Sequence, residues 1–156
     1  MVAIRFKPGL LLRVPLDDGM HTYGRMLARK PYMAFHDFRT REETPDPVEV
    51  AKSPVLFVVV TSAASVKEEG WDPLGVVPLD EVDTPIPPSF RQDPDNPKDL
   101  KIVDALGNER VATVEECLGL ENWGVGWHAD HIQDRLNDHY AGRENIWVEQ
   151  VRLKIP

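Results

Sequence analysis

The residues best placed to do chemistry are polar side chains on one face of a predicted helix that spans residues 129–141. His131, Asp134 and Asp138 recur there at helical spacing, so the three side chains share a face. One imidazole and two carboxylates could bind a divalent metal ion or act as an acid–base pair. The same pattern is typical of an exposed face whose carboxylates pair with nearby cations, opposite an apolar stripe. Since no HExxH pattern or Cys/His spacing supports a metal site, we prefer this second interpretation and expect no cofactor.

Cys117 is the only cysteine of the chain and the second candidate for chemistry. A nucleophilic cysteine needs its thiolate form and a histidine nearby, but the carboxylates of Glu115 and Glu116 would raise the pKa of this thiol. A buried structural cysteine is the simpler interpretation. The sequence also has no G-x-S-x-G elbow and no glycine-rich phosphate loop after a strand. We therefore predict no catalytic residue.

Two regions could instead bind a protein partner. Trp123 and Trp127 are separated by a segment with two glycines, and they either anchor a helix to the core or form partly exposed hot spots. The stretch 84–97 contains five prolines and reads as a long surface loop, where binding residues concentrate. The candidate contacts from these regions are Phe90, Arg91, Asp93, Asp95, Trp123 and Trp127.

The elements that must position these residues begin with a predicted β-hairpin. Apolar residues alternate from Leu10 to Leu16, Asp17-Asp18-Gly19 supplies a tight turn, and the return strand covers residues 21–29. Pro15 has no N–H, so either its strand lies at an edge of the sheet or the position of the missing N–H points outward; we expect the hairpin to lie nearer an edge. Gly24 predicts a bulge or a close approach of another group to the backbone.

Further elements follow from the same patterns. The run VLFVVVT, residues 55–61, is continuously apolar and predicts the central strand of the sheet. Segments 39–52 and 62–73 read as polar connections, and Thr113 and Glu116 stand at capping-box spacing for a short helix. The other expected elements are strands over 32–38 and 74–79, a second hairpin over 101–105 and 110–113, a helix over 129–141 that ends at Gly142, and an extended segment over 146–155.

Together these elements predict one α+β domain over residues 1–156, with a mainly antiparallel sheet. We expect that sheet to be strongly bent or to form a partly open barrel, with one or two C-terminal helices. The formal charge of −8 argues against a nucleic-acid partner and suits a partner with a basic surface. No segment has the length of a membrane span, and a single cysteine fits a reducing compartment, so we expect a cytoplasmic protein.

Two stretches resemble the immunity protein 26 family of bacterial polymorphic toxin systems. The first is PLDDG followed by a return strand with Tyr23, Gly24, Arg25, Met26 and Leu27. The second is EECLGLENW followed by HIQDRLNDHYAGRENIWVEQV. The resemblance implies a mostly β protein that neutralises a cognate toxin, for example a nuclease, by binding it.

The resemblance also leaves two alternatives open. Some relatives carry a phosphotriesterase label, which would make the chain a metal-dependent hydrolase with His131, Asp134 and Asp138 as candidate ligands. The other alternative is a structural or adaptor domain that has no toxin partner.

Overall fold

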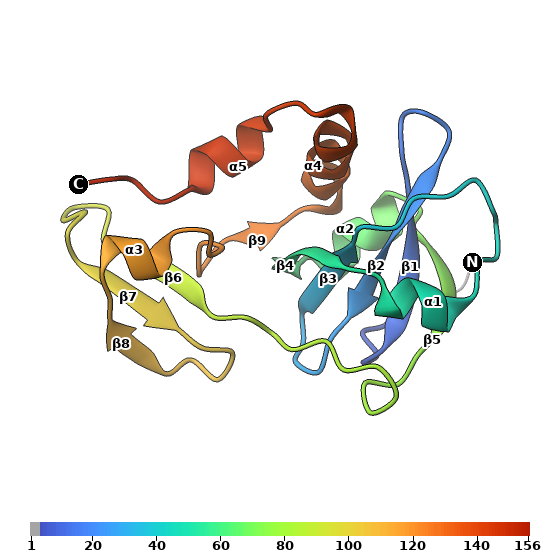
Figure 1. The fold of residues 1–156 in the computed structure, drawn as a ribbon, viewed down its shortest axis with the longest axis horizontal. Coiled ribbons are helices and arrows are strands. Elements are labelled where there is room, and N and C mark those ends of the chain that lie inside the picture. Colours follow the sequence, from blue (N-terminus) through green and yellow to red (C-terminus); the bar gives the residue numbers. More distant parts are fainter. Residues whose placement is uncertain (1–3) are drawn as a thin grey trace.

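The chain forms two β-sheets, a larger one built mostly from its first half and a smaller one from residues 89–111 (Figure 1). The structure is a computed structural model and describes residues 4–156. The strands, in spatial order, are β5 (Asp72–Val76), β1 (Leu10–Pro15), β2 (His21–Met26), β3 (Tyr32–His36), β4 (Val55–Thr61) and β9 (Gly126–Trp127) in the larger sheet, and β6 (Ser89–Gln92), β7 (Leu100–Val103) and β8 (Glu109–Val111) in the smaller. Within residues 4–156 every pair of neighbours is antiparallel except β4 and β9. The predicted α+β class is confirmed, and the described sheets form no closed barrel.

The opening hairpin has the predicted turn but lies inside the sheet. Gly19 has a φ of +81°, and the Asp18 carboxylate accepts the N–H of Met20 at 2.9 Å. The first alternative for Pro15, an edge strand, is wrong, because β5 pairs with the other side of β1. That pairing ends at Arg13, so Pro15 never needs an N–H for it. Gly24 does mark a close approach: a Cβ there would lie 2.6 Å from Phe35 Cε1.

Strand β4 is not the central strand of the sheet. Its outer neighbour β9 covers only Val60 and Thr61. The strand is continuously apolar because it is covered on both faces: Phe57 and Val59 belong to the main core, and Val58 packs against Leu27 and Ala34. Coverage of both faces therefore does not place a strand at the middle of the strand order.

In the described part of the chain, residues 4–156, five helices connect or cover the sheets: α1 (Pro47–Lys52), α2 (Ala63–Glu68), α3 (Val114–Cys117), α4 (Ala129–Ala141) and α5 (Ile146–Val151). The capping box of α3 and the end of α4 at Gly142, with a φ of +70°, are as predicted. Helices α1 and α2 were missed because their segments look polar, although Asp46 and Ser62 cap them.

Two further segments differ from the sequence-based expectation. Residues 146–151 are helical rather than extended, because Asn145 accepts the N–H of Val148 at 3.0 Å and starts α5. The proline-rich stretch 84–97 contains strand β6, which occupies its proline-free part.

The main core lies between one face of the larger sheet and helices α2 and α4. It contains the buried side chains Leu12, Val14, Leu16, Met26, Met33, Phe35, Phe57, Val59, Val66, Trp71, Trp127, Ala129, Ile132 and Leu136. A second cluster joins the opposite face to α1 through Leu11, Tyr23, Val50, Ala51 and Val77. These two layers fix the sheet whose far edge, at β9, leads to the smaller sheet (Figure 1).

A buried arginine fastens the link between the two sheets. Arg25 is 0% exposed, and its guanidinium donates hydrogen bonds to Val77 O at 2.6 Å and Val82 O at 2.7 Å. It also donates to Pro78 O at 3.2 Å and Thr84 Oγ1 at 2.9 Å. The chain between β5 and β6 is therefore attached to β2 by one side chain. Burial lowers the pKa of this guanidinium, although the carboxylate of Asp83 opposes that effect.

Candidate partner-binding surface

Residues 121–123 run along β6 and bring Trp123 onto the smaller sheet. Phe90 donates its N–H to Glu121 O at 3.0 Å, and Trp123 donates its N–H to Phe90 O at 2.7 Å. The indole of Trp123 is 40% exposed, a large fraction for this residue type. The loop that begins after α3 thus acts as a short extra strand and fixes the backbone of Trp123.

Arg91 joins Trp123 to the neighbouring strands. Its guanidinium carbon lies 5.7 Å from the centroid of the Trp123 ring, within cation–π distance. The same guanidinium pairs with Glu109 at 2.6 Å. We call Arg91, Glu109 and Trp123 the Arg–Trp platform. A half-buried arginine and an exposed tryptophan stand here in fixed positions, and both residue types contribute strongly to binding energy at protein interfaces.

A negatively charged loop borders this platform. The Asp93 carboxylate accepts the N–H groups of Asp95 at 2.8 Å and Asn96 at 3.3 Å, which fixes the turn after β6. Asp95 itself is exposed. The loop forms part of a shallow pocket of about 390 Å³ with Arg91 and Lys101. The platform and the loop therefore present an aromatic ring, a cation and several carboxylates on one small sheet.

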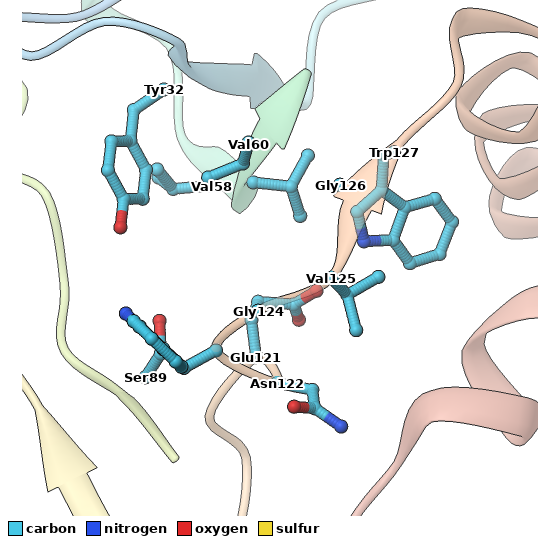
Figure 2. Close-up of a pocket in the computed structure, with 12 residues that line it drawn as sticks. Tyr32, Val58, Val60, Ser89, Glu121, Asn122, Gly124, Val125, Gly126 and Trp127 are labelled. Carbon is cyan, nitrogen blue, oxygen red and sulfur yellow. The ribbon is translucent and has the colours of Figure 1, made fainter. Parts of the chain in front are cut away.

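A second cavity lies between the two sheets, as Figure 2 shows. Its volume is about 270 Å³. The larger sheet contributes Tyr32 and Val58, and the loop next to β6 contributes Trp123. Glu121, also in its lining, is held by Arg135 through two bonds of 2.7 and 3.1 Å. This wall of the cavity is thereby tied to helix α4.

The candidate contact residues divide into four that are at least partly exposed and two that are buried. Trp123, Arg91, Asp93 and Asp95 lie together on the platform and its loop, whereas Phe90 is 1% and Trp127 5% exposed. Phe90 packs against Leu100 and Cys117 beneath the smaller sheet. Trp127 belongs to the main core and lies 5.0 Å from the guanidinium of Arg135. The two buried aromatic residues support the surface from below, and their assignment as direct contacts stays a prediction.

The polar face of α4 has partners within the protein. The His131 ring stacks on Trp147 with centroids 3.7 Å apart, and Asp134 accepts the Trp147 indole N–H at 2.9 Å. Asp138 accepts a hydrogen bond from the Asn145 side chain at 2.9 Å. These three residues thus hold α5 and its N-cap against α4, which is a structural use of each side chain.

A different trio has the spacing of metal ligands. Within residues 4–156, Glu69, His128 and Asp130 form the one group of at least three side chains whose possible ligand atoms lie within 4.8 Å of one another. However, His128 Nδ1 accepts the N–H of Asp130 at 3.2 Å as the N-cap of α4. A neutral ring then carries its proton on Nε2, which lies 3.5 Å from Glu68. Because both ring nitrogens are engaged, the trio supports no metal assignment.

Cys117 is 0% exposed, in the cluster beneath the smaller sheet. Burial, and to a lesser extent the Glu116 carboxylate, raises the pKa of its thiol. The side chain therefore lacks both the access and the thiolate character of a nucleophile. The packing role expected from the sequence agrees with this position.

Comparison with known proteins places the chain in a family. A family model described as immunity protein 26 matches residues 7–101, more than half of the chain. Comparison with curated proteins and with solved structures gives no match. The chain belongs to the immunity protein 26 family, which confirms the resemblance to that family. The match contains the first of the two stretches on which the resemblance was noted, and the second, within residues 115–151, lies outside it. None of the helices within residues 4–156 is long and apolar enough to span a membrane.

Proposed function

We propose that this member of the immunity protein 26 family binds and neutralises a cognate bacterial toxin without catalysis of its own. The observation that carries the proposal is the family match over residues 7–101. The structure supports a binding role, because the side chains that could do chemistry have structural partners instead. His131, Asp134 and Asp138 contact Trp147 or Asn145 and so hold α5 against α4.

The Arg–Trp platform is the contact surface that we propose. Trp123 and Arg91 would be its energetic centre, since a fixed aromatic ring and a planar cation lose little freedom on binding. Phe90 and Trp127 would keep this surface rigid from beneath. Asp93 and Asp95 would form a rim that faces positive charge on the toxin.

The charge of the chain points to a toxin with a basic surface, such as a nuclease. The formal charge is −8, and the platform lies next to an acidic loop. Complementary potentials accelerate encounter and weaken as salt rises. We propose that this protein meets the toxin in the cytoplasm. The single cysteine of the chain fits that reducing compartment, where thiols stay reduced.

The test is co-expression with the toxin domain encoded beside this gene. The expected result is survival of the cells and a complex that can be purified. Trp123→Ala and Arg91→Ala should each weaken that complex at least about tenfold, the size of a hot-spot loss above about 1 kcal/mol. Leu106→Ala, at a residue 67% exposed on the turn between β7 and β8, is the matched control and should bind as the wild type does.

The rim makes a separate prediction about rate. Asp95→Asn should slow association more than it changes dissociation, and the difference should shrink at high salt. If the neighbouring toxin domain neither binds the wild-type protein nor loses toxicity in its presence, the proposed function is wrong.

A further inference from the structure

Strand β9 offers an open main-chain edge next to the proposed platform. It is the last strand of the larger sheet, and within residues 4–156 no strand pairs with its outer side. The strand is short: only Gly126 and Trp127 pair with β4. An unpaired edge is a template for another extended segment.

The hydrogen bonds of β9 show which groups point outward. Ser62 donates its N–H to Trp127 O at 3.0 Å, so the main-chain groups of Trp127 face β4. Successive residues of a strand direct these groups to opposite sides, so the N–H and C=O of Gly126 face away from β4. Gly126 is exposed, and a Cβ built on it would meet no heavy atom within 4 Å. Its donor and acceptor are therefore accessible.

Two pockets flank this edge and share its residues. The cavity of about 270 Å³ lies on the side of Tyr32 and Val58, and Figure 2 shows Val125 and Trp127 pointing away from it. A pocket of about 170 Å³ lies on the other side, with His131 and Trp147 in its lining. Val125, Gly126 and Trp127 line both. Side chains of a strand alternate between faces, so a segment paired with β9 would direct successive side chains toward the two pockets.

We propose that an extended segment of the cognate toxin adds to the β9 edge as a further strand and places apolar side chains in these two pockets. This inference rests on the proposed function, and it names how the partner is held. A polypeptide is the occupant that we propose, because an extended main chain presents an acceptor and a donor that match the N–H and C=O of Gly126. A segment with positive residues between its apolar ones is favoured by the charge of −8, which also opposes pairing with a second copy of the chain.

Two variants at Gly126 test the inference. Gly126→Trp places a ring on the face of β9 opposite to Val125 and Trp127, in the open space where a side chain of the added segment would lie, and Gly126→Pro removes the outward N–H. Leu106→Trp adds the same ring at an exposed position of the second hairpin and is the control. Circular dichroism and urea unfolding confirm that each variant is folded. The probe is the catalytically inactivated toxin domain encoded beside this gene, with affinity measured by calorimetry and amide exchange measured on the complex.

For the wild type, the expected result is a 1:1 complex in which amide exchange at residues 124–127 slows. Both Gly126 variants should lose affinity at least about tenfold, and Leu106→Trp should not. If wild type and Gly126→Trp bind equally, or if the 124–127 amides stay unprotected, the inference is overturned while the proposed function stands. A wild-type dimer that Gly126→Trp converts to monomers would also overturn it, because the occupant would be a second copy. Failure of the wild type to bind the toxin refutes both proposals.

Discussion

Replacing Arg25 with methionine should destabilise the protein strongly, although Arg25 forms no salt bridge among residues 4–156. Its guanidinium satisfies four oxygens of residues 77–84 at 2.6 to 3.2 Å. A buried acceptor left without a donor costs about 1–3 kcal/mol. Removal of a buried charge returns several kcal/mol of desolvation, so we expect a net loss of about 3 kcal/mol. Arg25→Lys should lose a similar amount, because one ammonium cannot span four oxygens in this geometry.

The assay is urea unfolding followed by tryptophan fluorescence. With a slope of about 2 kcal/mol per M, the expected loss lowers the midpoint by about 1.5 M. Arg152→Met is the control, since Arg152 is 64% exposed and pairs with Glu149 on the surface. Its midpoint should stay within about 0.5 M of the wild type. A similarly small change for Arg25→Met would refute the claim that this side chain attaches residues 77–84 to the sheet.

Three further predictions concern single residues. Gly24→Ala should cost about 1–3 kcal/mol in unfolding free energy, because its Cβ would lie 2.6 Å from Phe35. Gly126→Ala should be nearly neutral, since its Cβ would meet no heavy atom within 4 Å, and equal losses for the two variants would contradict this prediction. Burial lowers the pKa of His36, so the unfolded chain takes up the proton first and stability should fall as pH drops below about 6.5, by at most about 1.4 kcal/mol per pH unit. His36→Gln should reduce that slope in unfolding measured between pH 5 and about 7.5, and an unchanged slope would show that other groups cause it. Cys117, 0% exposed, should react with a thiol reagent only after urea unfolds the chain, and rapid labelling of the native protein would refute its burial.

The sequence predicted the elements whose signals are local. The Asp-Gly turn at 18–19, the capping box at Thr113 and the stop at Gly142 each depend on a few neighbouring residues. Helix α5 was missed because residues 146–155 were expected to form one extended segment, whereas Asn145 caps a helix at its start. Strand order was also missed, since both faces of β4 can be covered without another full strand beside it.

The burial of Arg25 has a signal in the sequence. It lies two residues from Tyr23 and so on the same face of β2, and that face is buried. A charged residue at a core position needs fixed partners, which here are carbonyl oxygens more than fifty residues away in the chain. Only the fold could identify these partners, although the position alone indicated that some were required.

The sequence indicated which residues could form the partner-binding surface, but it did not indicate how they lie relative to one another. Trp123 and Arg91 are 32 positions apart in the sequence, and the bond from Trp123 N–H to Phe90 O brings them together. That bond also orients the chain toward β9, where Gly126 exposes its main chain between two pockets. The glycines next to the tryptophans therefore matter for more than flexibility. A side chain at position 126 would project from the face of β9 opposite to Val125 and Trp127, so its absence leaves that face open to a side chain of the partner segment.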